Sequence, residues 1–113
     1  RAVLLEQAGG DVELAREIAD LFLETCPKLL GEVRDAIDRG DAEPLSRAAH
    51  ALKGSAAVFG AAAFVETARE IETRCGEGDL VGIRELGGRL EREGEALRAA
   101  LASFRARGEA GGP

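Results

Sequence analysis

The chain has few of the residues that build metal sites, disulfide frameworks or aromatic cores. Its 113 residues include one histidine, two cysteines and four phenylalanines, and no tryptophan, tyrosine or methionine. One histidine and two distant cysteines do not make a set of metal ligands, so we expect no metal site. The apolar residues are mainly alanine and leucine, which favours close-packed helices over a strand-rich sandwich.

Long apolar runs and an excess of basic residues are also missing. No stretch approaches the roughly 20 apolar residues of a membrane span. The 15 Lys and Arg residues stand against 21 Asp and Glu, giving a net charge of −6. Such a charge repels nucleic-acid backbones and anionic lipids, so we expect this domain to contact neither. Cys26 and Cys75 are expected among apolar neighbours, the pattern of free thiols in a reducing cytosol, which predicts a cytoplasmic protein.

Length and apolar periodicity predict a single all-α domain. A chain of this size with 45% hydrophobic residues buries one core. Short turns between helices make sequence neighbours antiparallel, which predicts an up-down-up-down four-helix bundle. The apolar stripe predicted for the first helix consists of Leu14, Ile18, Leu21, Phe22, Leu29, Val33 and Ile37. Pro27 falls inside this helix and predicts a kink or a split near that position. The four helical patterns cover about Asp11–Arg39, Ala42–Phe59, the segment between Gly60 and Gly76, and Leu80–Phe104.

The limits of the domain follow from where the periodicity stops. We expect residues 1–107 to form the bundle and residues 108–113, which have no apolar periodicity, to form a frayed tail. The chain begins at Arg1 and contains no methionine, so we expect it to have been trimmed at its start or excised from something longer. Four amphipathic stripes can cover one another without a second copy, which predicts a monomer.

The second predicted helix places the only histidine on its polar side. At about 100° per residue, His50 falls roughly 140° from the apolar stripe, which predicts an imidazole in water at mid-helix. Arg47 at i−3 and Lys53 at i+3 share its patch of surface and bring positive charge to it. Gly54 removes a side chain from the surface that a docking partner has to approach. The apolar stripe itself consists of Leu45, Ala48, Ala49, Leu52, Ala56 and Phe59.

Each of these residues alone has an ordinary structural explanation, but the combination is specific. His50-Ala51-Leu52-Lys53-Gly54-Ser55, followed by Phe59-Gly60-Ala61, resembles the signature of histidine-containing phosphotransfer (Hpt) domains. Leu45-Ser46-Arg47-Ala48-Ala49 and Ile71-Glu72 also resemble that family, and the similarity spans nearly the whole chain. The resemblance implies phosphorylation of His50 on Nε2, assisted by Lys53 and Gly54. The surface that meets the partner is expected to include Arg47, Ser46, Ala57 and Ala61.

The chemistry of a carrier agrees with the residue types present. A neutral imidazole is nucleophilic near pH 7, and its phosphoramidate is a high-energy adduct that passes the group onward. The sequence has no Gly-rich nucleotide loop, paired-carboxylate site or metal cluster, so we expect a carrier without its own cofactor rather than an enzyme. By the same resemblance, the partner is a response-regulator receiver domain or a hybrid histidine kinase, and the receiver supplies an aspartate and Mg²⁺.

Three other functions remain open at this point. The dimerisation segment of a histidine kinase usually has an acidic residue directly after its histidine and a proline soon after, whereas Ala51 follows His50 and the next proline is Pro113. The phosphotransfer domain of a chemotaxis-type kinase shares the His-x-x-Lys-Gly pattern, but the short four-helix layout favours the receiver-facing kind. A helical interaction module with an incidental histidine would expose a large apolar stripe away from His50, and the sequence indicates none.

Overall fold

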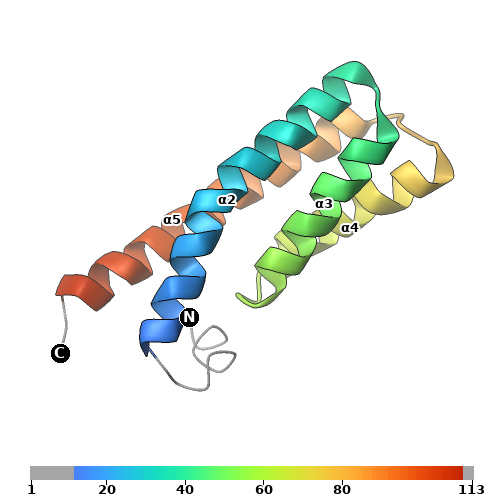
Figure 1. The fold of residues 1–113 in the computed structure, drawn as a ribbon. Helices are drawn as coiled ribbons and strands as arrows, with labels where there is room; N and C mark the ends of the chain where they lie inside the picture. Colours follow the sequence, from blue (N-terminus) through green and yellow to red (C-terminus); the bar gives the residue numbers. More distant parts are fainter. Residues whose placement is uncertain (1–11, 111–113) are drawn as a thin grey trace.

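The computed structural model describes residues 12–110, with side chains up to Phe104, and this part of the chain contains four helices and no strand. Contacts join α2 to α3, α3 to α4, α4 to α5 and α5 back to α2, which closes a ring of neighbours. The chain is therefore an all-α, antiparallel up-down-up-down bundle, as predicted (Figure 1). The helices are α2 (Val12–Arg39), α3 (Ala42–Ala57), α4 (Ala62–Glu77) and α5 (Ile83–Ala110).

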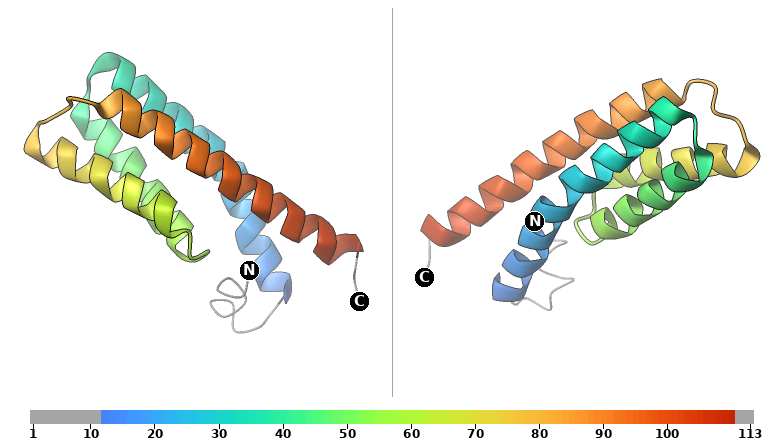
Figure 2. Two further views of the ribbon diagram at one scale, coloured as in Figure 1. Left: turned by 180° about the vertical axis from the view of Figure 1, so that it is seen from behind. Right: turned by 45° about the horizontal axis from the view of Figure 1, so that its top comes forward.

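The helices form one long pair and one short pair. α2 and α5 have 28 residues each, whereas α3 and α4 have 16 each. At about 1.5 Å per residue the long pair extends well past the short pair, and the molecule measures 50 × 20 × 17 Å. Figures 1 and 2 show this extension where α2 begins and α5 ends. The bundle thus has four helices in cross-section over only part of its length.

Pro27 does not divide the first helix. α2 is continuous from Val12 to Arg39 with Pro27 exposed inside it, so the predicted alternative of two stacked helices is wrong. A proline removes one backbone donor and bends a helix without necessarily ending it. The Thr25 hydroxyl also donates to the Leu21 carbonyl at 3.0 Å, a contact that favours bending. Figure 1 shows α2 changing direction along its length.

Glycines in the left-handed region end two of the helices. Gly40 has φ 65°, and the next amide, that of Asp41, donates to the Ala36 carbonyl at 2.9 Å. Gly78 has φ 70° and closes α4, so that helix runs past the turn that was predicted to begin at Gly76. A residue with a side chain is strained in this conformation, which is why a glycine stands at each position.

The predicted ends of the other helices differ from the observed ones by a few residues. α3 ends at Ala57, and the apolar stripe that suggested Phe59 continues into the following turn. α5 begins at Ile83 rather than Leu80, because the connection from α4 is longer than predicted. At its other end α5 continues to Ala110, so residues 108–110 of the expected tail are helical. Residues 1–11 and 111–113 lie outside the described part of the chain.

The core is built from small and large apolar residues on the inner face of every helix. Phe22 lies against Phe59 and Phe64 in edge-to-face contacts, with ring centroids 5.1 and 6.4 Å apart. Burying such side chains contributes about 1.5–3 kcal/mol each. Two leucines assigned to the α2 stripe are exposed instead, Leu14 by 42% and Leu21 by 62%. The largest fully buried side chains are Phe64, Leu45, Leu52, Ile71, Leu90, Val33 and Cys26.

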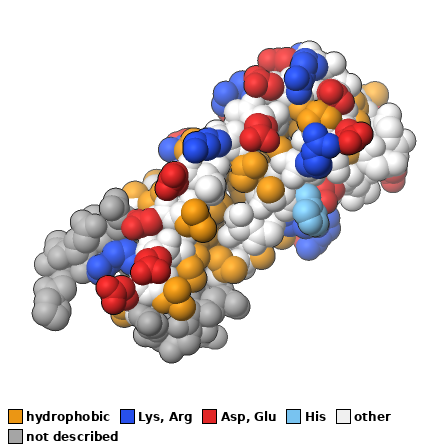
Figure 3. Space-filling view, in the orientation of Figure 1, with side chains coloured by type: hydrophobic (Ala, Val, Ile, Leu, Met, Phe, Trp, Pro, Cys, Tyr) orange, Lys and Arg blue, Asp and Glu red, His pale blue; other side chains and the backbone are white. Residues whose placement is uncertain are grey.

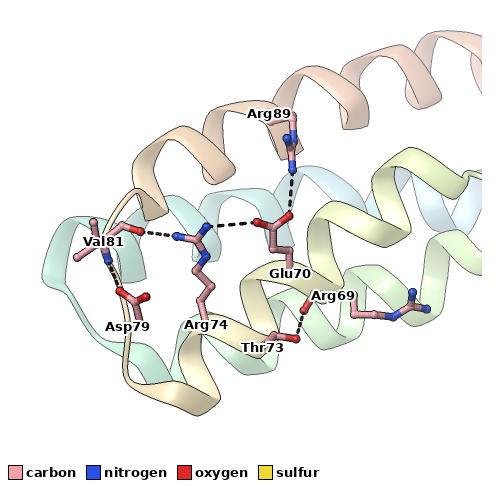
Figure 4. A network of polar contacts seen from close by, with 7 residues as sticks. All are labelled: Arg69, Glu70, Thr73, Arg74, Asp79, Val81 and Arg89. Atoms are coloured by element: carbon pink, nitrogen blue, oxygen red, sulfur yellow. Dashed lines mark hydrogen bonds and ion pairs between the residues drawn. The ribbon is translucent and has the colours of Figure 1, made fainter.

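Polar contacts fix the connection between α4 and α5. Arg74 donates to the Val81 carbonyl at 2.5 Å and pairs with Glu70 at 3.3 Å. Arg89 of α5 pairs with the other oxygen of Glu70 at 3.3 Å, and Asp79 accepts from the Val81 amide at 3.1 Å (Figure 4). Glu70 therefore links α4 to α5 through Arg89, and Arg74 joins the same carboxylate to the connection at Val81. In the described residues, no helix combines the length and hydropathy needed to span a membrane.

Candidate functional site

His50 lies in the middle of α3 on its solvent face. The buried residues of α3 are Leu45, Ala48, Ala49, Leu52 and Ala56, which is the predicted stripe within the helix. The His50 side chain is 71% exposed, in agreement with its predicted position. In Figure 3 the pale-blue imidazole stands out from the surface of the molecule.

A carboxylate from the neighbouring helix holds one edge of the imidazole. His50 Nδ1 and Glu72 Oε2 are 2.8 Å apart, although the two residues are 22 positions apart in the sequence. The other oxygen of Glu72 lies 2.6 Å from Lys53 Nζ in an ion pair. Glu72 is 20% exposed, and it follows Ile71, which is fully buried in the core. One carboxylate on α4 thus bridges the histidine and the lysine of α3.

The electrostatics of this bridge keep Glu72 ionised. Burial by itself raises the pKa of the Glu72 carboxyl, but its contacts with Lys53 and His50 outweigh burial and lower that pKa below its ordinary value of 4.5. An ionised carboxylate accepts hydrogen bonds and cannot donate them. The hydrogen bond therefore runs from Nδ1–H of His50 to Glu72. In a neutral ring with this tautomer, the free lone pair is on Nε2.

Lys53 and Arg47 differ in how they relate to His50. Lys53 is only 26% exposed and belongs to the bridge through Glu72. Arg47 is 69% exposed and pairs with Glu43, one turn earlier on α3, at 2.9 Å. The structure therefore brings Lys53 into the cluster of His50 and Glu72, whereas Arg47 contacts a different acid at its edge.

The small residues around His50 leave its surroundings open. A Cβ atom added at Gly54 would meet no heavy atom within 4 Å. Ala57 is exposed and Ala61 half-buried, and both line one shallow depression with Val65 of α4. Ser46 is half-buried one turn before His50 and is not part of that depression. Three of the predicted partner-facing positions are thus small residues: Ser46 and Ala57 on α3, and Ala61 directly before α4.

An apolar groove beside Gly54 was not predicted. It has a volume of about 350 Å³ and lies between α2 and α3, with Leu21 largely exposed at its wall. The periodicity of α2 had assigned its apolar wall to the core, so no feature of the sequence indicated an exposed groove. Its lining residues are Ile18, Leu21, Phe22, Thr25, Leu29, Gly54, Ser55 and Val58.

The remaining candidate groups do not add a second chemical site. Cys26 and Cys75 are free thiols among apolar neighbours, as predicted, with Cys26 inside the core and Cys75 half-buried against it. Burial raises the pKa of the Cys26 thiol to about 11, so it is not a reactive thiolate near neutral pH. Within residues 12–104, no group of three or more His, Cys, Asp or Glu side chains comes together as metal ligands.

Fold and site together define an antiparallel four-helix bundle that presents one imidazole on a helix face. The family model described as the Hpt domain matches residues 17–106, well over half of the chain. The chain belongs to the Hpt family, whose members are phosphotransfer carriers in two-component relays and in general exchange the group with receiver domains. Comparisons with curated proteins and with solved structures gave no match.

Proposed function

We propose that His50 is the phosphoacceptor of this domain and that it exchanges a phosphoryl group with the aspartate of a receiver domain through Nε2. The observation that supports this most directly is the contact between His50 Nδ1 and Glu72. This contact occupies Nδ1 with its proton and leaves the free lone pair on Nε2. A ring that is 71% exposed is open to a partner at that nitrogen.

The reaction needs little from this chain beyond the nucleophile. The Nε2 lone pair attacks phosphorus, the N–P bond forms, and the bond from phosphorus to the receiver aspartate breaks, which leaves a carboxylate on the receiver. The Mg²⁺ ion that neutralises the phosphoryl oxygens belongs to the receiver. Lys53, at i+3, adds positive charge next to the incoming group. The domain acts as a carrier and leaves the activation of phosphate to its partner.

The partner meets His50 across small residues. Gly54, one turn after His50, has open space above it, and Ala57 at the end of α3 and Ala61 directly before α4 are the other small residues of this surface. Arg47 and Ser46 border it on the preceding turn. Because Gly54, Ala57 and Ala61 are small, a receiver can bring its aspartate to within bonding distance of Nε2. We propose that these residues form the docking surface and that the domain binds as a monomer.

Transfer of label from a phosphorylated receiver tests the assignment. The wild-type domain, mixed with a phosphorylated receiver domain and Mg²⁺, is expected to take up one acid-labile phosphoryl group, and His50→Gln none. Glutamine keeps polarity and most of the size but has no nucleophilic ring nitrogen, and an exposed position tolerates it. Circular dichroism checks that the variant is helical. Uptake by folded His50→Gln, or an acid-stable label on Ser46 or Ser55, contradicts the proposal.

A further inference from the structure

The carboxylate of Glu72 touches the same ring that would carry the phosphoryl group. Its Oε2 atom is 2.8 Å from His50 Nδ1, on the side of the ring away from the proposed N–P bond. Glu72 is set in place by its neighbour Ile71, which is 0% exposed, and by the ion pair of its other oxygen with Lys53. Phosphorylation at Nε2 therefore does not have to displace Glu72 from the ring.

The protonation state of Nδ1 determines what this contact does once Nε2 carries the phosphoryl group. Attack by Nε2 on phosphorus leaves Nδ1–H in place, so the ring becomes a cation and the phosphoryl group an anion. If Nδ1 then releases its proton to solvent, the leaving group of the next transfer is an imidazolate, which is strongly basic and leaves poorly. If Nδ1 keeps the proton, the electron pair of the N–P bond returns to Nε2 and a neutral imidazole leaves. Onward transfer is thus fastest from the protonated adduct.

We infer that Glu72 is a positioning residue that holds the proton on Nδ1 of phosphorylated His50, so that the group is received and passed on without a proton transfer. This inference rests on the proposed function. A carboxylate hydrogen-bonded to a cationic ring favours the charged form of that ring. The N–P bond that forms in one direction breaks in the other, and Nδ1–H···Glu72 stays intact throughout. The cycle needs no general acid or base from either protein at this ring.

The other charged groups near the ring do not replace Glu72 in this role. On α3, Lys53 pairs with Glu72 itself and Arg47 pairs with Glu43. On α4, Arg69 lies one turn before Glu72 and pairs with Glu66. On the α2 side, the groove beside Gly54 is lined by uncharged residues. Among the described residues, Glu72 is the one carboxylate in contact with the imidazole.

A direct test follows the Nδ1 proton by nitrogen NMR. Because His50 is the only histidine in the chain, ¹⁵N-histidine labelling gives one ring spectrum. Phosphoramidate charges the domain chemically, and a pH titration then reports when Nδ1 loses its proton. Wild type and Glu72→Gln are compared with Glu70→Gln, which changes a neighbouring α4 carboxylate that contacts Arg74 and Arg89 instead. We expect the midpoint of Glu72→Gln to fall by about one pH unit or more, and that of Glu70→Gln to match wild type.

Onward transfer to a receiver provides a second, kinetic readout. Relative to Glu70→Gln with the same receiver, Glu72→Gln should lose rate progressively as the pH rises from its own midpoint to that of the control, by about tenfold in total for each unit that separates the two midpoints. Equal midpoints in wild type and Glu72→Gln overturn the inference and leave the phosphoacceptor role of His50 standing. A loss of rate by one constant factor at every pH also overturns it, because Glu72 would then only orient the ring. Absence of an Nε2 adduct in the wild-type domain defeats the proposed function itself.

Discussion

Two glutamates on α4, Glu70 and Glu72, make similar contacts with different consequences. Each bridges two basic side chains, and each links α4 to an adjacent helix. Glu70 joins Arg74 to Arg89 of α5 at 3.3 Å from each, and its side chain is 44% exposed. Glu72 joins His50 to Lys53 of α3 at 2.8 and 2.6 Å, and its side chain is 20% exposed. Two positions along one helix thus separate a surface ion-pair network from the candidate site.

The difference lies in the partner groups and in the solvent around them. A guanidinium group stays protonated at any pH that a protein encounters, so Glu70 has only positive charge to stabilise. An imidazole has two distinct nitrogens, and a carboxylate on one of them determines the tautomer and hence the nucleophile. Lower exposure also makes the contacts of Glu72 less screened than those of Glu70. The same residue type therefore supports the connection between α4 and α5 at one position and, in our proposal, sets the tautomer of the phosphoacceptor at the other.

Removing one basic side chain from each glutamate, Lys53 from Glu72 and Arg89 from Glu70, should separate the two regions most clearly. We expect Lys53→Ala to slow phosphoryl transfer by roughly 10- to 100-fold, less than the loss of a buried oxyanion donor, because Lys53 is partly exposed. Arg89→Ala should leave the transfer rate unchanged. Both changes remove partly exposed cations and should alter stability by about 1 kcal/mol or less. Single-turnover transfer and urea unfolding measure these effects, and equal transfer rates in the two variants would make Lys53 an ordinary surface residue.

Two helix glycines allow a second comparison between the candidate site and the rest of the bundle. A Cβ atom added at Gly54 or at Gly31 meets nothing within 4 Å. Alanine at either position should therefore raise stability by up to about 1 kcal/mol through helix propensity. Only Gly54→Ala should weaken receiver docking, because its methyl group stands on the proposed docking surface. We expect a higher KM for the receiver in Gly54→Ala and no change in Gly31→Ala. Similar KM values would remove Gly54 from that surface.

Acid unfolding should show the smallest effect and tests the electrostatics of Glu72. Because the pKa of Glu72 is lowered in the folded state, its ionisation stabilises the fold above its ordinary value of 4.5. That contribution is lost as the pH falls through the lowered folded-state pKa. The stability difference between wild type and Glu72→Gln, measured by urea unfolding, should therefore shrink on acidification below pH 4.5. A difference that stays constant from pH 7 to pH 3 would show that packing, and not charge, accounts for it.

Periodicity predicted the parts of the structure that depend on single helices. The apolar stripe of the second helix was enough to place His50 on the solvent face, because a helix repeats every 3.6 residues whatever it packs against. The same reasoning was wrong for Leu14 and Leu21 of α2, which share the phase of the core but remain exposed. Periodicity reports which face a residue occupies. It does not report whether another helix is long enough to cover that face.

The sequence by itself determined the four amphipathic helices, the glycine stops between them and the position of His50, Lys53 and Gly54 along one helix face, because local geometry fixes each of these. It also contained Ile71-Glu72 as part of the family resemblance, without a role for the carboxylate. Only the packing of α4 against α3 brought Glu72 to His50, since residues 22 positions apart meet through tertiary contacts alone. The groove beside Gly54 is likewise a feature of the packing between α2 and α3. Which nitrogen of the imidazole is free to react was therefore decided by the tertiary structure, because the choice depends on a hydrogen bond between two helices.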